Sequence, residues 1–270
     1  MEASSLDSSP DRLSHFRGLR HLVFAILEPG SFVTYDLRRK RVLGVLSSAA
    51  AKDKTFWDAR LLPITIGILG PTVGVAPLHC ACLDRNGCGL LVAGLSGAGK
   101  STLSVALARR GFALVSDDWT YVSGEQSSLV AHGLSAPVKL LPDAARFFPE
   151  LQETTPKKTF NGELAFEIDP ARTFQAAVKP SSRPRWLLLL ERTATPGCRF
   201  VPCLADHARD FFERSAERLP EEFSSARSAR SDIIKSLSNC DSWILHTGDS
   251  PRQTAEAIDR FLPEVGHGTT

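Results

Sequence analysis

Residues 89–118 of the chain read GLLVAGLSGAGKSTLSVALARRGFALVSDD. Positions 90–93 are apolar on both faces, as in a central strand that is covered on both sides. A glycine loop follows, and then a helix-compatible segment at 101–110, which ends in two arginines before Gly111. Residues 112–116 resemble a second strand. The order strand, loop, helix, strand predicts a unit of the α/β class.

The glycine loop reads Gly94-Leu-Ser-Gly-Ala-Gly99-Lys100-Ser101 and fits the P-loop pattern G-x-x-x-x-G-K-[ST]. Glycines let consecutive backbone N–H groups curl around phosphate oxygens, and the following helix points its positive end at them. The lysine reaches the β- and γ-phosphates, and the serine hydroxyl ligates Mg²⁺. A glycine-rich turn with an exposed lysine is the alternative interpretation. We predict that MgATP binds at Gly94, Leu95, Ser96, Gly97, Ala98, Gly99, Lys100, Ser101 and Thr102.

Two adjacent acids, Asp117 and Asp118, end the strand that follows the helix. If this strand lies beside the strand at 90–93, which precedes the glycine loop, in a parallel sheet, both carboxylates emerge at the carboxyl edge of that sheet, where ligands bind. One carboxylate can hold Mg²⁺, and the other can accept the proton of an attacking hydroxyl. A strand-end turn capped by aspartate is the alternative. Glu191, after the apolar run 187–190, is a rival carboxylate that we interpret as the solvated end of a buried strand.

His79 is placed by a predicted hairpin. The sequence Asn-Gly at 86–87, between two apolar runs, predicts a two-residue turn because both positions need a positive φ. Such a turn pairs Leu83 with Leu90 and would set His79 opposite Gly94. The imidazole would then lie beside the first residue of the loop, where it could meet the γ-phosphate or orient an aspartate. A structural histidine at a strand end is the alternative.

The charge balance, the lengths of the apolar runs and the cysteine spacing argue against several classes of protein. The 32 Lys and Arg against 30 Asp and Glu give a formal charge of +2, so we expect neither nucleic acid nor an anionic membrane as a partner. The longest apolar run, 61–70, is too short for a bilayer, which needs about 20 residues. The N-terminus lacks the pattern of a secretion signal. Six cysteines without metal-ligand spacing favour reduced thiols, so we predict a cytoplasmic protein.

The chain divides into three predicted parts. Residues 1–18 are rich in Ser, Asp and Arg and are expected to be disordered. Residues 19–75 hold short apolar runs, including a hairpin of 31–36 with 41–46, and are expected to form a β-rich section packed on the core. The P-loop core spans 76–265. Within it we expect a short helix at 142–151, strands at 186–190 and 243–246, helices over 205–239, and a last helix that starts at a Ser250 cap.

The spacing of these residues resembles the catalytic domain of HPr kinase/phosphorylase, within the P-loop kinases related to phosphoenolpyruvate carboxykinase. The resemblance covers about fifty residues, 75–125. It comprises His79 fifteen residues before Gly94, the run Gly97-Ala-Gly99-Lys100-Ser101, the pair Arg110-Gly111, and Asp117-Asp118 seventeen and eighteen residues after the lysine. Leu62-Pro63 and Ala76-Pro-Leu-His79 also resemble HPr kinase-related proteins, some of which modify peptides.

The resemblance implies a serine or hydroxyl kinase with a mixed α/β core. It implies that Lys100 holds phosphate and that Ser101 binds the metal. It also implies that Asp118 acts as general base and that His79 lies in the active site. We expect Asp117 to hold the metal together with Ser101. Basic residues that could contact the acceptor or the phosphates are Lys139, Lys157, Lys158 and Arg172, each with a solvated surface role as the alternative.

Two departures from the family bear on the phosphate acceptor. The loop has Leu95 where the family usually has aspartate, and the later glycine-rich signature with its acid and arginine is not found in the sequence. We therefore expect transfer of the γ-phosphate to a hydroxyl other than that of HPr, on a small molecule or on a serine of a peptide or protein. The alternatives are an ATP-binding regulatory module without phosphotransfer and an ATPase or metabolite enzyme of the carboxykinase type. A homo-oligomer is left open.

Overall fold

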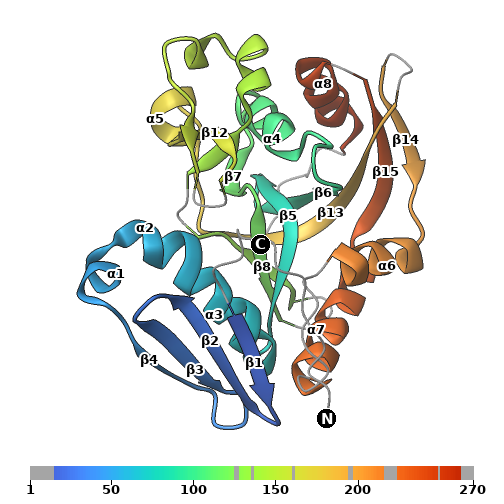
Figure 1. Ribbon diagram of the computed structural model, residues 1–270. Helices are drawn as coiled ribbons and strands as arrows, with labels where there is room; N and C mark the ends of the chain where they lie inside the picture. The colour runs from blue at the N-terminus through green and yellow to red at the C-terminus, as the bar shows by residue number, and fades with distance from the viewer. Residues whose placement is uncertain are drawn as a thin grey trace. The chain divides into compact units, whose positions relative to one another are not determined.

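The computed structural model describes residues 15–124, 128–134, 137–159, 162–193, 197–215, 224–248 and 250–262. The chain divides into two compact units, Met1–Val73 with Leu219–Arg227, and Gly74–Arg218 with Ser228–Thr270. Figure 1 shows that one sheet belongs to the N-terminal part of the chain, whereas a larger sheet is assembled from strands of the remainder. The protein is therefore of the mixed α/β class, as predicted. None of the helices in these ranges has the length and apolar character needed to cross a membrane.

The first unit contains a four-stranded antiparallel sheet in the order β1-β2-β3-β4. Its strands are His15–Leu19, Leu22–Glu28, Ser31–Asp36 and Arg41–Val45. The predicted hairpin is present as β3 and β4. Residues 15–18 pair with β2 as part of an edge strand, so the expectation of disorder is wrong for them. Residues 1–14, also expected to be disordered, lie outside the described residues.

Helices follow this sheet where the sequence indicated only short apolar runs. They are α1 (Ser48–Lys52), α2 (Lys54–Phe56), a π-helical turn (Trp57–Leu61), α3 (Leu62–Leu69) and a 3-10 turn (Gly70–Val73). Phe56, Leu61 and Ile68 form one apolar cluster with the buried face of the sheet, which includes Val23 and Tyr35. The expectation of β structure is wrong for 48–73, because burial against the sheet outweighs the β propensity of isoleucine and threonine.

The second unit is built on an eight-stranded mixed sheet in the order β14-β15-β13-β6-β5-β8-β9, with β7 paired to β5 and β9 paired also to β13. Among the described strands the parallel pairings are those of β13, with β6 on one side and β15 on the other. The strands are β5 (Val75–Arg85), β6 (Cys88–Gly94), β7 (Ala113–Ser116), β8 (Trp119–Ser123), β9 (Val130–His132), β13 (Ser181–Arg192), β14 (Arg199–Pro202) and β15 (Asp241–Thr247).

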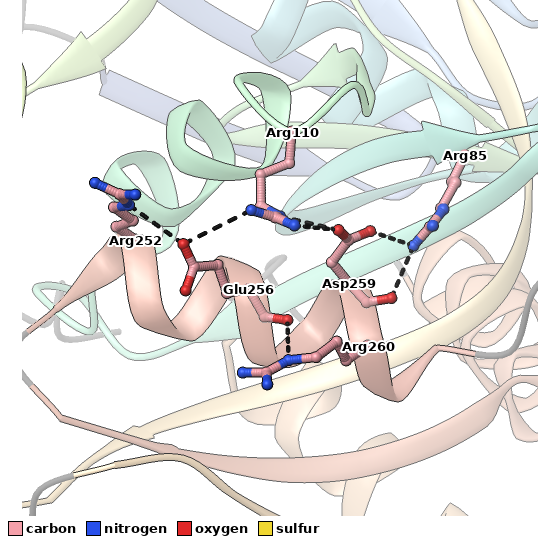
Figure 2. A network of polar contacts seen from close by, with 6 residues as sticks. All are labelled: Arg85, Arg110, Arg252, Glu256, Asp259 and Arg260. Atoms are coloured by element: carbon pink, nitrogen blue, oxygen red, sulfur yellow. Dashed lines mark hydrogen bonds and ion pairs between the residues drawn. The ribbon is translucent and has the colours of Figure 1, made fainter.

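Helices cover both faces of this sheet. One apolar cluster joins Leu188 and Leu190 of β13 to α4 (Lys100–Ala108) and α8 (Pro251–Phe261). The other joins the alternate β13 leucines to α6 (Ala205–Ser215) and α7 (Ser224–Ser236). Figure 2 shows that α8 is also tied to the end of the α4 segment by ion pairs between Arg110 and Asp259. The all-apolar strand predicted at 186–190 is therefore buried on both faces.

A further group of short elements lies near α4, the helix that follows the glycine loop. A small sheet has the order β10-β12-β11. Its strands are Val138–Leu140, Leu164–Ile168 and Lys157–Lys158, and α5 is Pro170–Phe174. The helix expected at 142–151 appears as two 3-10 turns, Pro142–Arg146 and Pro149–Leu151. The strand expected at 243–246 lies in β15, and α6, α7 and a 3-10 turn (Leu237–Asn239) account for 205–239 apart from 216–223, which lie outside the described residues. The last helix has Ser250 as its N-cap, as predicted, and the Ser250 hydroxyl accepts the Gln253 N–H at 3.2 Å.

The position of β7 differs from the expectation. On the sequence alone we considered this strand as a parallel neighbour of β6, but β7 pairs with β5, which lies between them. The hairpin turn sets β5 against one edge of β6, and β13 occupies the other edge, so β6 has no edge left for β7. Because β6 and β7 are both antiparallel to β5, they run in the same direction. The ends of both strands therefore reach the same edge of the sheet.

Candidate active site

The hairpin of β5 and β6 sets the registration of the site. Asn86 and Gly87 have φ values of 54° and 86°, as the two-residue turn requires. The ladder runs from the pair Arg85–Cys88 to the pair Cys80–Ala93, in the predicted register. His79 is the next residue of β5 and Gly94 the next residue of β6. The turn thus brings the imidazole to the start of the glycine loop.

The loop between β6 and α4 has the backbone that its glycines permit. Gly97 and Gly99 have φ values of 78° and 95°, which other residues adopt at a cost. Gly94 is required by close approach, because a Cβ there would lie 3.1 Å from the Leu190 carbonyl oxygen. Leu95, at the tip, is 74% exposed. The loop is therefore a turn whose three glycines leave room for a phosphate group to approach the backbone.

Lys100 is folded back over this loop. Its side chain is buried, and Nζ donates to the Gly94 carbonyl oxygen at 2.9 Å and to that of Leu95 at 3.4 Å. Burial lowers the pKa of Lys100, and the negative charge of Asp118, followed by smaller contributions that include Asp117, opposes that shift. The ammonium group lies at the mouth of the loop with carbonyl oxygens as its partners. Phosphate oxygens would offer it stronger, charge-assisted hydrogen bonds.

Asp117 is partly buried, and one of its carboxylate oxygens is buried without a partner. Its Oδ2 accepts the Lys139 N–H at 3.4 Å, whereas Oδ1 is buried without a hydrogen-bond partner. Burial raises the pKa of Asp117 to about 7, the neighbouring charge of Asp118 adds to this, and a hydrogen-bonding contact with the Ser101 hydroxyl opposes it. A carboxylate with one buried and unpaired oxygen is costly to keep ionised unless a cation joins it.

Asp118 and His79 are joined by a hydrogen bond at the same edge. His79 Nε2 lies 3.0 Å from Asp118 Oδ1, and the Asp118 side chain is 52% exposed. Burial alone would raise the pKa of Asp118, but the hydrogen bond and charge of His79, with the charges of Lys139 and Lys100, lower it below its ordinary value. The carboxylate therefore stays ionised and open to solvent at neutral pH. It can accept a proton from a group that approaches from solvent.

Ser101 and Asp117 fit the metal that the sequence predicts. A serine hydroxyl and a carboxylate are oxygen ligands of the kind that Mg²⁺ prefers, and the unpaired Asp117 Oδ1 lacks a partner that the ion could supply. The described part of the chain contains no group of three His, Cys, Asp or Glu that could hold a metal alone. Mg²⁺ is commonly held by one or two carboxylates together with substrate phosphates. The pair thus suits a metal that arrives with a nucleotide.

The structure shows which of the other candidate residues, four basic side chains and Glu191, lie near the two aspartates. Lys139 lies close enough to act on the Asp118 carboxylate and its N–H contacts Asp117. Glu191 faces His246, with 3.5 Å between Oε2 and Nδ1. Lys157 and Lys158 form the exposed strand β11, and Arg172 is exposed on α5. Only Lys139 of the four basic candidates thus has a described contact with the aspartates.

One residue of the site was missed. Trp119 stacks on the His79 ring, with 5.4 Å between the ring centroids. A tryptophan after two acids carries no chemical signal by itself. It could have been found only by predicting that β8 pairs with β5, which sets Trp119 opposite His79.

The fold and the site together define a mixed α/β protein with a glycine loop, a lysine and two aspartates at one edge of its central sheet. Residues 74–139 match the HPr Serine kinase C-terminal domain family. The chain is 38% identical over 82 residues to the HPr kinase/phosphorylase of Bacillus mycoides (strain KBAB4), and 32% identical over 94 residues to that of Bacillus cereus (strain B4264). These matches confirm the resemblance: over this segment the chain is similar to HPr kinase/phosphorylase.

The matched segments are partial. They cover 30% and 35% of the chain, and the chain spans 26% and 29% of the length of the two relatives. A solved structure, that of the Hpr(Ser) kinase/phosphatase from Coxiella burnetii, aligns with 68% of the chain and 86% of its own length at 18% identity and a TM-score of 0.36. The segment that carries the sequence match includes His79, the glycine loop and both aspartates.

Proposed function

We propose that the chain is an ATP-dependent phosphotransferase that moves the γ-phosphate of MgATP to a hydroxyl group. One observation carries the proposal. Lys100, the metal-suited pair Ser101 and Asp117, and the open carboxylate of Asp118 converge at the end of one glycine loop. Phosphoryl transfer requires little beyond positioning and charge stabilisation, which are the roles these groups can fill.

The chemistry follows from the places of the residues. Lys100 and the loop amides hold the β- and γ-phosphates, and the positive end of α4 faces them. Mg²⁺, when bound by Ser101 and Asp117, neutralises charge on those phosphates. The acceptor oxygen forms a bond to Pγ as the bond from Pγ to the bridging oxygen breaks, and ADP leaves. The hydroxyl proton passes to the Asp118 carboxylate, whose Oδ1 is held by His79.

The acceptor that we propose is a serine of a peptide or protein, or a small alcohol. The half-exposed Asp118 side chain supports an acceptor that arrives from solvent. The exposed apolar Leu95, in place of an acid, supports an acceptor other than HPr. HPr kinase/phosphorylase is the description of the relatives, which the chain matches over about a third of its own length. HPr itself therefore belongs in the test as one acceptor among others.

The Asp118→Asn variant tests the proposed chemistry. We expect ADP release in the presence of an acceptor to fall at least about 100-fold, because the amide cannot take the proton. The Kd for ATP should stay within about threefold, since Asp118 is not one of the predicted phosphate ligands. The assay follows ADP release with MgATP and HPr, serine peptides or small alcohols. The matched control is Asp206→Asn on α6, an exposed acid outside the site, which should leave both quantities unchanged.

Three results would contradict the proposal in different ways. Unchanged turnover in Asp118→Asn would reject the assignment of the base. ATP binding without transfer to any acceptor would favour a regulatory nucleotide-binding module. A wild-type protein that does not bind ATP, and a Lys100→Ala variant that behaves the same, would reject the nucleotide site itself.

A further inference from the structure

The indole of Trp119 covers one face of the His79 imidazole. The two rings are stacked with their centroids 5.4 Å apart and their planes 26° apart. The ladder between β5 and β8 pairs these two residues directly, so the contact is part of the sheet. Trp119 also follows Asp118 in the chain. One short segment thus supplies both the carboxylate and the ring that flank the imidazole.

The two contacts of His79 constrain different motions of its ring. The interaction with Asp118 Oδ1, at 3.0 Å from Nε2, fixes the direction in which the ring edge points. The torsion between Cβ and the ring of a histidine is broad, so a hydrogen bond alone leaves the ring plane free to rock. A stacked indole removes that freedom, because the parallel arrangement is lost when the ring turns.

The segment that carries Asp118 and Trp119 is itself held rigidly. The buried Thr120 hydroxyl donates to the Cys80 carbonyl oxygen at 2.7 Å and lies 2.6 Å from the Ser116 hydroxyl. Ser116 ends β7 and Thr120 belongs to β8, so this contact closes the turn that contains both aspartates. The indole is therefore attached to a fixed backbone, and its position can be transmitted to the imidazole.

We propose that Trp119 is a positioning residue of the active site, which holds the His79 imidazole in the plane that aligns it with Asp118 and so orients the carboxylate for the incoming hydroxyl. The proposal rests on the proposed function, because the carboxylate is oriented for phosphoryl transfer. Trp119 acts through His79 and needs no contact with the nucleotide. Its loss should lower kcat more than it changes the KM for ATP.

A double-mutant cycle tests this dependence on His79. We expect Trp119→Leu, which keeps an apolar side chain but loses the ring, to lower kcat about tenfold with the KM for ATP within about twofold. Trp119→Phe keeps a stacking ring and should stay within about threefold of wild type. In a His79→Ala background, Trp119→Leu should cost nothing further, because coupled residues are not additive. A second tenfold loss in that background, or a Trp119→Phe variant as slow as Trp119→Leu, would overturn the proposal.

A spectroscopic measurement separates this proposal from the proposed function. Removal of the stacked imidazole in His79→Ala should change the tryptophan emission of the folded protein. The same substitution in a Trp119→Phe background should leave the emission of the remaining three tryptophans unchanged. Equal changes in both backgrounds would reject the stack as the link. A wild-type protein that transfers no phosphate would reject the proposed function and the catalytic role, while the emission difference would still identify the stack.

Discussion

Asp117 combines a cost in stability with a role in the proposed chemistry. Its pKa of about 7 in the folded protein lies above the value of about 3.9 in an unfolded chain. The folded state therefore binds the proton more tightly. The stability that this provides is complete below the unfolded pKa and is lost as the pH rises through about 7. At pH 8 the metal-free protein must keep a charged carboxylate whose buried Oδ1 has no hydrogen-bond partner.

The Asp117→Asn variant tests this conflict. Without metal at pH 8 we expect its free energy of unfolding to exceed that of wild type by roughly 1–3 kcal/mol, and the difference to vanish near pH 4. Addition of Mg²⁺ with a nucleotide should stabilise wild type more than the variant, because only the carboxylate is a good ligand. Urea unfolding at the two pH values measures both effects. A variant less stable than wild type at pH 8 in EDTA would contradict the account.

Residue patterns along the chain predicted a set of side chains that the structure brings close together, but not every contact among them. The residues from Gly94 to Asp118 could be selected from the sequence because their types and spacing fit a known phosphate-binding pattern. Trp119 has no such signature, and Lys139 was only one of four basic candidates. Their places depend on which strand neighbours which. That depends on contacts between residues far apart in the sequence, which local patterns do not encode.

At the scale of elements, the turn residues allowed the register of one strand pair to be predicted. The order of the strands in the sheet could not be predicted in the same way. Two residues with positive φ fixed the register of β5 and β6. The neighbours of β7 could not be predicted in this way, because β5 takes part in pairings with β6, β7 and β8. In the first unit, α3 reads Leu-Pro-Ile-Thr-Ile-Gly-Ile-Leu, and this β-branched run forms a helix that packs Ile68, with the partly buried Ile64 and Leu69, against the apolar cluster of the sheet.

Asp84 links the hairpin to β13 and makes a prediction at this scale. It is buried, and it accepts hydrogen bonds from Lys179, Ser182 and the Gly87 N–H. Burial alone would raise the pKa of Asp84, but these partners outweigh it and lower the pKa below its usual value. The stability that they provide is present above the unfolded pKa and is lost as the pH falls through the lower, folded pKa.

The Asp84→Asn variant should therefore lose the charged partner of Lys179. We expect the free energy of unfolding to fall by about 1–3 kcal/mol at pH 7. On acidification from pH 5 to pH 3, the stability of wild type should fall more steeply than that of the variant, which has no carboxylate to protonate. Asp143→Asn, at an exposed acid with only a 4.0 Å contact to Arg146, is the control and should change little. Parallel pH profiles for wild type and Asp84→Asn would contradict the argument.

At the scale of the whole second unit, one carboxylate joins three distant segments. Asp259 on α8 accepts from Arg110, at the end of the α4 segment, at 2.6 Å and 3.0 Å. It also contacts Arg85, at the end of β5, at 2.5 Å. Figure 2 shows Asp259 between these two guanidinium groups, with Glu256 one turn away. Because Asp259 is only 17% exposed, these pairs are worth more than surface salt bridges.

This network lies at the C-terminal end of the segment that begins with Lys100. It should therefore affect the stability of the fold but not the binding of ATP at the glycine loop. We expect Asp259→Ala to lower the free energy of unfolding by about 2–4 kcal/mol, since two partly buried arginines lose their shared carboxylate. Hydrogen exchange at α8 should accelerate, whereas the Kd for ATP should remain within about threefold of wild type. Arg252→Ala, which removes an 89% exposed side chain that pairs with Glu256, is the control and should cost less than about 0.5 kcal/mol. If Asp259→Ala instead weakened ATP binding tenfold while α8 stayed protected, the network would belong to the nucleotide site and not to the packing of the last helix.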